Sequence, residues 1–148
     1  MVDAESISSR LAHLDELLAE LDAIRAAGRE AYAAEWRTRL ATEHALQLAI
    51  QACIDVGAHL VSELGLKAPT DYRGVFESLC PAGLDPGLAE RLAAATGMRN
   101  ILVHGYLDVD DDTVWSALAK LDDLRDFAAA AQRMVDADGR APESIKAG

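Results

Sequence analysis

The chain has 148 residues, and its 14 Lys and Arg against 25 Asp and Glu give a net charge of −11 at pH 7. This length suits one domain with a single core, and 29 Ala and 20 Leu with only 4 Pro favour helices over a β-sandwich or barrel. The charge excludes a broadly basic nucleic-acid binder, but not a local cationic site.

Targeting signals are absent from the sequence pattern. No apolar run approaches the ~20 residues of a bilayer span, and residues 1–10 lack the basic-then-apolar order of a signal peptide. Cys53 and Cys80 lie among apolar residues, without a Cys-x-x-Cys motif, which is typical of free thiols in a reducing compartment. We therefore expect a cytoplasmic protein without membrane contact, and the excess of Arg over Lys with abundant Ala suggests a prokaryotic genome.

Two helices are expected in the first half of the chain. The first has an apolar stripe with alternating spacings of four and three, starts at a cap among Ser6, Ser8 and Ser9, and ends at Gly28. The stripe consists of Ile7, Leu11, Leu14, Leu18 and Leu21. The second helix is long and runs from near residue 30 to Gly65, with a break in the thirties or early forties. Small residues such as Gly57 allow neighbouring helices to approach it closely.

The second half predicts a short helix and two further long ones. Pro69 sets a turn before a short helix over residues 72–79. Asp85 caps the next helix, Pro86 opens it, and Gly105 ends it. A last helix runs from about residue 113 to 136. We expect an all-α domain over residues 1–137, an up-down bundle of four long helices and one short one, and a disordered tail over residues 138–148.

One segment gathers polar groups around an apolar run at residues 101–103. Arg99, Asn100, His104 and Tyr106 offer a fixed cation, a group that titrates near neutrality and a phenol. On a regular helix Arg99 and His104 point about 140° apart, so they meet only if the helix ends near His104. Such a set suits a phosphodiester, with Arg on the non-bridging oxygens and His in proton transfer. The alternative interpretation is a helix end with a capping His and a Tyr at the edge of the core.

The remaining polar residues favour neither a metal nor a nucleotide cofactor. The spacing of Asp108, Asp110 and Asp112 resembles the start of a calcium loop, but Thr113 and Ala119 replace its Gly and Glu. No Cys or His set has zinc spacing, and there is no Gly-rich phosphate loop. Structural roles are expected for the other histidines, which are His13, His44 and His59.

The sequence Arg99-Asn100-x-x-x-His104-x-Tyr106 resembles the Arg-x-x-x-x-His-x-Tyr motif of the HepT-like branch of the HEPN superfamily. Residues 46–57, with the acidic Asp55, resemble the long second helix of that family. Residues 59–72 and 89–97 also follow its course, so that the resemblance covers roughly residues 7–135. It implies helical bundles that dimerise and place two motifs beside one cleft.

The resemblance also implies an activity and partners. HepT-like proteins are metal-independent endoribonucleases and toxins, paired with a small nucleotidyltransferase antitoxin that adenylylates the motif Tyr. Carried over to this chain, Arg99 and His104 are catalytic, Asn100 is supporting, and Tyr106 is the modification site. The implied partners are an RNA substrate, a cognate nucleotidyltransferase and a second copy of the chain.

One departure keeps a second hypothesis open. The acidic run of Asp108 and residues 110–112 follows the motif directly, where it either repels the phosphates of RNA or else faces solvent or caps the last helix. The second hypothesis is that the chain is a non-catalytic binding partner and substrate subunit of the nucleotidyltransferase, which the net charge of −11 favours. Intact Arg99 and His104 favour the ribonuclease.

Overall fold

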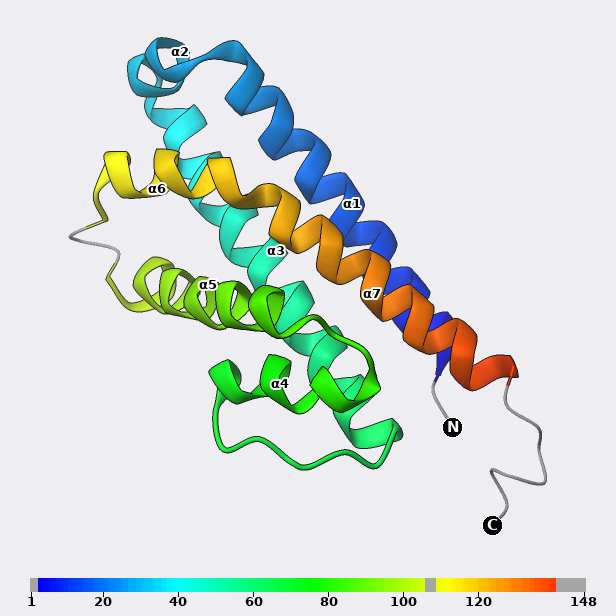
Figure 1. Cartoon of the computed structure of the whole chain (residues 1–148). Helices are drawn as coiled ribbons and strands as arrows, with labels where there is room; N and C mark the ends of the chain where they lie inside the picture. The colour runs from blue at the N-terminus through cyan, green and yellow to red at the C-terminus, as the bar shows by residue number, and fades with distance from the viewer. Residues whose placement is uncertain (1–2, 106–108, 141–148) are drawn as a thin grey trace.

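The computed structural model describes residues 3–105 and 109–140, and within these ranges every regular element is a helix (Figure 1). The long helices are α1 (Ala4–Ala27), α3 (Trp36–Glu63), α5 (Pro86–His104) and α7 (Leu121–Arg140). The short elements are α2 (Arg29–Ala34), α4 (Tyr72–Ser78), α6 (Asp111–Ala117) and the 3-10 turns η1 (Cys80–Ala82) and η2 (Leu118–Lys120). The predicted all-α class is confirmed.

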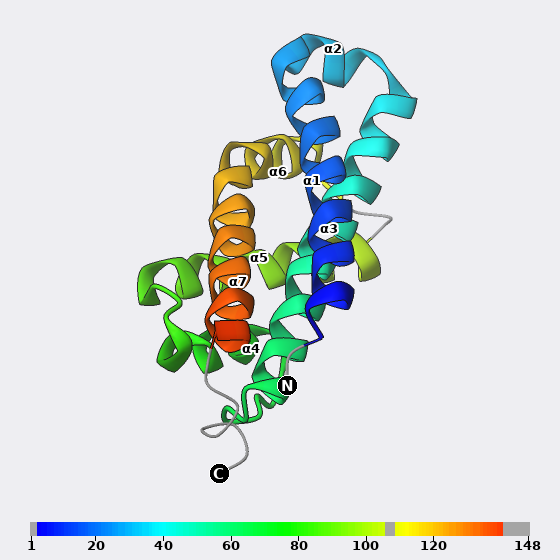
Figure 2. The ribbon, with the colours of Figure 1, turned by 90° about the vertical axis from the view of Figure 1, so that its right-hand side faces the viewer.

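The axes of three long helices are roughly parallel. In Figures 1 and 2, α1, α3 and α7 lie along a common axis, with α1 running opposite to α3 and α7, while α5 crosses them steeply. Helix α5 packs against α3, α7 and the short α4, and this shared packing turns it away from the common axis. Helix α5 is therefore strongly tilted relative to the other three, and its C-terminal end lies at the flank of α3. The up-down order of the bundle stays a prediction.

The first half of the chain folds much as its pattern predicts. The expected stripe of α1 is buried, but the cap is Asp3, whose carboxylate accepts a 3.0 Å hydrogen bond from the Ser6 backbone N–H. The three serines predicted as caps therefore lie inside the helix. The expected break occurs at Glu35, whose extended backbone separates α2 from α3. Asp71 caps α4 by accepting from the Gly74 N–H at 2.8 Å.

In the second half of the chain the predicted start of α5 is confirmed, whereas the predicted last helix is divided in two. Asp85 caps α5 by accepting from the Leu88 N–H at 2.9 Å, and Pro86 is its first residue. The single helix expected from about residue 113 is instead α6 and α7, joined by the 3-10 turn η2. Helix α7 continues to Arg140, beyond the expected end near residue 136. The remaining part of the predicted tail, residues 141–148, lies outside the described residues.

Helix α3 is the central element of the core. It buries ten residues and packs against α1, α4, α5 and α7. By length and composition alone it also passes as a membrane span, with a mean hydropathy of 1.3 over 18 residues. Its buried face is that of a core helix, and the absence of membrane contact stays a prediction.

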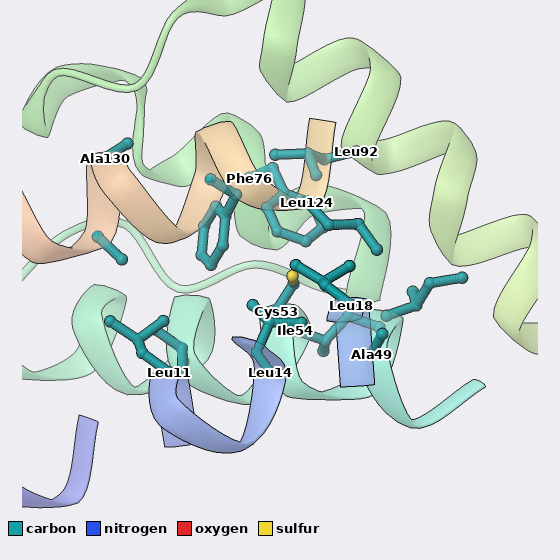
Figure 3. Packing of buried hydrophobic residues seen from close by; sticks show 14 of the residues in the cluster. Leu11, Leu14, Leu18, Ala49, Cys53, Ile54, Phe76, Leu92, Leu124 and Ala130 are labelled. Atoms are coloured by element: carbon teal, nitrogen blue, oxygen red, sulfur yellow. The ribbon is translucent and has the colours of Figure 1, made fainter. Parts of the chain in front are cut away.

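The core between α3, α4 and α7 is tightly packed. Figure 3 shows leucines of α1 against Cys53 and Ile54 of α3, with Phe76 of α4 beside them. The rings of Phe76 and Phe127 meet edge to face at 5.4 Å. Both cysteines are free, and complete burial raises the pKa of the Cys53 thiol. Gly57 allows α4 to pack close to α3, because a Cβ at position 57 would lie 2.7 Å from Val75 Cγ1.

Replacing Gly57 with Ala should therefore destabilise the protein. Val75 is only 2% exposed and cannot move aside freely, so we expect a loss of about 1–3 kcal/mol of unfolding free energy in urea denaturation. Gly97→Ala is the matched control, because no atom lies within 4 Å of a Cβ built there. Helix propensity should stabilise that variant by up to ~1 kcal/mol. Equal stability of the two variants would contradict the close approach at Gly57.

Candidate functional site

Arg99 lies on α5, and its half-buried side chain reaches across to α3. Its Nε–H donates a 2.8 Å hydrogen bond to Oε1 of Gln51, and its Nη1 donates one of 3.0 Å to Oδ1 of the neighbouring Asn100. Asn100, expected as a supporting residue, therefore contacts Arg99 directly. The guanidinium is therefore held by hydrogen bonds at two of its nitrogens, Nε and Nη1.

Two further residues, Asp55 and Tyr72, support this arrangement. The amide Nε2 of Gln51 donates a 2.8 Å hydrogen bond to Oδ1 of Asp55, one turn further along α3. The ring of Tyr72, at the start of α4, lies under the guanidinium, with the Arg99 Cζ 5.2 Å from the ring centroid. The sequence interpretation gave no role to Gln51. A signal for it existed, because Gln51 and Asp55 are four residues apart and so lie on one face of the predicted helix, where an amide and a carboxylate can pair.

His104 is the last residue of α5 and is exposed. Within the described residues no hydrogen bond or ion pair joins it to Arg99. The helix continues through His104, so the side chains keep the roughly 140° separation of a regular helix. The third expected site residue, Tyr106, lies outside the described part of the chain.

Gly105 follows α5 as its C-cap, and a side chain at this position would clash with the last turn of the helix. Its N–H donates a 2.8 Å hydrogen bond to the Ile101 carbonyl, and its φ of −99° is open to any residue. A Cβ at this position would lie 2.9 Å from that same carbonyl oxygen. The glycine is therefore required for close contact with the last turn, and not for the left-handed conformation common at helix ends.

The acidic run after the motif is held by arginines of α2 and α3. Asp110 caps α6 by accepting from the Asp112 N–H at 3.0 Å. The carboxylate of Asp111 lies 3.5 Å from Nε of Arg39, and Asp112 pairs with Arg29. Asp110 thus takes the capping role considered for this run, whereas Asp111 and Asp112 lie exposed in the first turn of α6. Asp108 lies outside them.

Tyr32 is buried beneath these ion pairs. Its ring packs on Trp115 of α6 at 5.3 Å between centroids, and the residue is 2% exposed. Within the described ranges its hydroxyl has no hydrogen-bond partner. Burial first, and then the carboxylates of Asp111 and Glu43, raise the pKa of Tyr32 to about 12, against the opposing effect of Arg39.

This raised pKa predicts a pH dependence of stability. The unfolded tyrosine ionises near pH 10, whereas the folded one ionises near pH 12. The contribution of neutral Tyr32 is therefore complete below pH 10 and is lost as the pH rises to 12, with a slope of at most about 1.4 kcal/mol per pH unit. Denaturation midpoints measured over this range should fall less steeply for Tyr32→Phe. At pH 7 that variant should be as stable as wild type, because the hydroxyl has no partner; a clear loss at pH 7 would contradict this.

The described residues outside the motif form no metal site. In residues 3–105 and 109–140 no three His, Cys, Asp or Glu side chains lie close enough to hold a metal ion. His13 is exposed, with its Nδ1 3.9 Å from the Glu16 carboxylate. His59 is half-buried on α3, four turns from His44.

Fold and motif together define a helical protein of the ribonuclease class that the sequence resembles. The chain belongs to the HepT-like ribonuclease family, whose model, described as "Ribonuclease HepT-like", matches residues 14–131. The predicted family is confirmed, and with it the class of enzyme, a ribonuclease.

Named relatives agree with this assignment, and solved structures share the fold. The tRNA nuclease HepT of Aphanizomenon flos-aquae is 34% identical over 117 residues, which are 76% of this chain and 78% of that protein. The mRNA nuclease HepT of Shewanella oneidensis is 34% identical over 70 residues, which cover 47% of this chain and 53% of that one. The tri-AMPylated Shewanella oneidensis HEPN toxin, solved with its MNT antitoxin, shares the fold at a TM-score of 0.77 and 23% identity, covering 86% of this chain and 96% of that one. The cytosolic Bacillus subtilis protein YutE, of unknown function, has a TM-score of 0.81 at 20% identity, covering 93% of each chain.

Proposed function

We propose that this chain is the toxin of a toxin–antitoxin pair and acts as an endoribonuclease in the cytoplasm. The observation that carries the proposal is Arg99, which hydrogen bonds hold in place on the same helix as the exposed His104. The names of the related tRNA and mRNA nucleases support RNA as the substrate. The Shewanella oneidensis HEPN toxin, which shares this fold and was solved in complex with an MNT antitoxin, supports a minimal nucleotidyltransferase as the partner.

The proposed reaction needs only groups of the RNA and of the motif. The 2′-hydroxyl attacks the adjacent phosphorus, the bond to the 5′-oxygen breaks, and the products end in a 2′,3′-cyclic phosphate and a 5′-hydroxyl. His104 accepts the proton of the nucleophile or donates one to the leaving oxygen. Arg99 stabilises the negative charge on the non-bridging oxygens. Because the nucleophile belongs to the substrate, its position next to the phosphorus replaces activation by a metal.

We further propose that the active species is a homodimer. Arg99 and His104 leave α5 in different directions, so two copies that face each other with α5 place both kinds of group around one cleft. Ile101, between the two motif residues, is 46% exposed and offers an apolar contact to the second copy. A two-fold pairing also brings both Arg99 side chains together and concentrates positive charge on an acidic protein.

RNA cleavage tests this function. With EDTA present, the wild-type protein should cut RNA, and the products should carry cyclic phosphates that mass spectrometry can detect. His104→Ala and Arg99→Ala should each lower the rate by about 10²–10⁴-fold, the usual contribution of an acid–base or charge-stabilising group. Neither side chain fills the core, so circular dichroism and sedimentation of both variants should match wild type.

His13→Ala and Arg133→Ala are the matched controls, because they remove an exposed His and an exposed Arg outside the motif. Both should cut RNA at the wild-type rate. Full activity of a folded His104→Ala variant would overturn the ribonuclease proposal. A wild-type protein that binds the nucleotidyltransferase but cuts no RNA would support the second hypothesis, that of a non-catalytic substrate subunit.

We propose that adenylylation of Tyr106 neutralises the toxin. Tyr106 is two residues beyond His104, and an AMP on its phenol would bring a phosphate into the neighbourhood of the motif. That phosphate is a partner for the Arg99 guanidinium through charge-assisted hydrogen bonds, so the modified protein would occupy its own substrate site. The AMPylated state of the Shewanella toxin supports this mechanism.

The site of modification can be tested with the cognate nucleotidyltransferase and ATP. Wild type should gain the mass of AMP, and Tyr106→Phe should not. Tyr72→Phe is the control, since Tyr72 is the 46% exposed tyrosine of α4 and should not be labelled. An active Tyr106→Phe protein should also escape neutralisation. Label on Tyr72, or equal labelling of Tyr106→Phe, would refute Tyr106 as the switch and leave the nuclease proposal standing.

A further inference from the structure

The guanidinium of Arg99 has a complete set of supports on three sides. Gln51 of α3 binds its Nε edge, Asn100 binds one Nη1 proton, and the Tyr72 ring of α4 lies under its face. An arginine side chain has four rotatable bonds and loses rotamer entropy when it is held still. Contacts made before substrate arrives remove that cost from the binding step.

We propose that Gln51, oriented by Asp55, is the positioning residue for Arg99, with Tyr72 as its second support. This inference rests on the proposed ribonuclease function. It gives Gln51 and Asp55 of α3 and Tyr72 of α4 a role in positioning the catalytic arginine. None of the three touches the reacting phosphate. They act by fixing where the free edge of the guanidinium points.

The direction of the Gln51 amide is determined by its two partners. Its oxygen faces the Nε–H of Arg99, and its nitrogen faces the carboxylate of Asp55. A flipped amide would set N–H against N–H on one side and oxygen against oxygen on the other. Asp55 therefore selects the amide orientation that accepts from Arg99, although within residues 3–105 and 109–140 no hydrogen bond or ion pair joins Asp55 to Arg99 itself.

A neutral acceptor suits a phosphate-binding arginine. A carboxylate at position 51 would also accept from Nε, but it would neutralise the charge that Arg99 presents to RNA. In this chain the negative charge of Asp55 is one hydrogen bond further away. Since Gln51 accepts from Nε and Asn100 from Nη1, the second Nη1 proton and the Nη2 protons are the groups that the described contacts leave to donate to phosphate oxygens.

The Tyr72 ring sets the plane of the guanidinium. The distance of 5.2 Å from Cζ to the ring centroid is that of a cation–π contact. The ring is placed by the capped first turn of α4, where Asp71 accepts from the Gly74 N–H. Because the hydroxyl of Tyr72 takes no part in this contact, phenylalanine should serve as well as tyrosine at this position.

Steady-state cleavage of a short RNA tests the assignment. Gln51→Leu, which keeps the volume and loses the acceptor, should lower kcat about 10- to 100-fold with a melting temperature close to that of wild type. Gln51→Glu is the decisive variant, since it keeps an acceptor for Nε but adds a counter-charge. A purely structural tie between α3 and α5 predicts full activity for Gln51→Glu, whereas positioning of a charged Arg99 predicts a loss of at least about tenfold in kcat/KM. Tyr72→Phe should keep the wild-type rate and Tyr72→Leu should lose several-fold.

A double-mutant cycle shows whether Gln51 acts through Arg99. In an Arg99→Ala background, Gln51→Leu should cause no further loss, because the group that it positions is gone. Additive losses in the double variant, or full activity of Gln51→Leu and Gln51→Glu, would overturn the proposal.

A readout without catalysis separates this inference from the proposed function. The Nε–H of Arg99 should give a slowly exchanging NMR signal in wild type that is lost in Gln51→Leu. Loss of the signal with no RNA cleavage by wild type would refute the ribonuclease and keep the positioning contact. Cleavage by wild type with an Arg99 signal unchanged in Gln51→Leu would refute the positioning and keep the ribonuclease.

Discussion

The burial of α3 is the constraint on which the rest of the molecule depends. One face of this helix carries its ten buried residues, and α1, α4, α5 and α7 all pack against it. Gly57 lets α4 and α7 come close enough for the Phe76 and Phe127 rings to meet. The same helix carries Gln51 and Asp55 away from that core, so its burial also places the acceptor that Arg99 needs. Packing and site geometry are thus two consequences of one amphipathic helix.

Charge is distributed so that an acidic protein can hold a phosphate site. The net charge of −11 opposes RNA over the whole surface, but interactions between exposed charges are screened beyond about 8–10 Å. The described acids that follow the motif are engaged as a helix cap or with Arg39 and Arg29. Near Arg99 the acceptors in direct contact are neutral amides, which hold the guanidinium without cancelling its charge.

Local patterns in the sequence predict the helices and the motif, but not the contacts across helices. The stripe of α1, the Asp85–Pro86 start of α5 and the break before α3 follow from periodicity and capping, which act over a few residues. The steep crossing of α5 and the turn between α6 and α7 arise from packing against several partners at once. In the same way, Arg99 and His104 are visible as a motif, whereas Gln51 is 48 residues away from Arg99 and only the folded chain joins them. The serine caps predicted for α1 were wrong because Asp3, three residues earlier, accepts from the Ser6 N–H.

The spacing of the motif explains why Arg99 and His104 are treated so differently by the fold. Five residues along a helix rise about 7.5 Å and turn the side chain by about 140°, so one helix cannot present both groups to a phosphate from the same side. The fold holds the first group firmly, through α3 and α4, and leaves the second exposed at the helix end. A fixed cation suits charge stabilisation, which gains from preorganised geometry. A histidine at a helix end is suited to proton transfer, because it can adjust to whichever oxygen of the bound RNA gains or loses the proton.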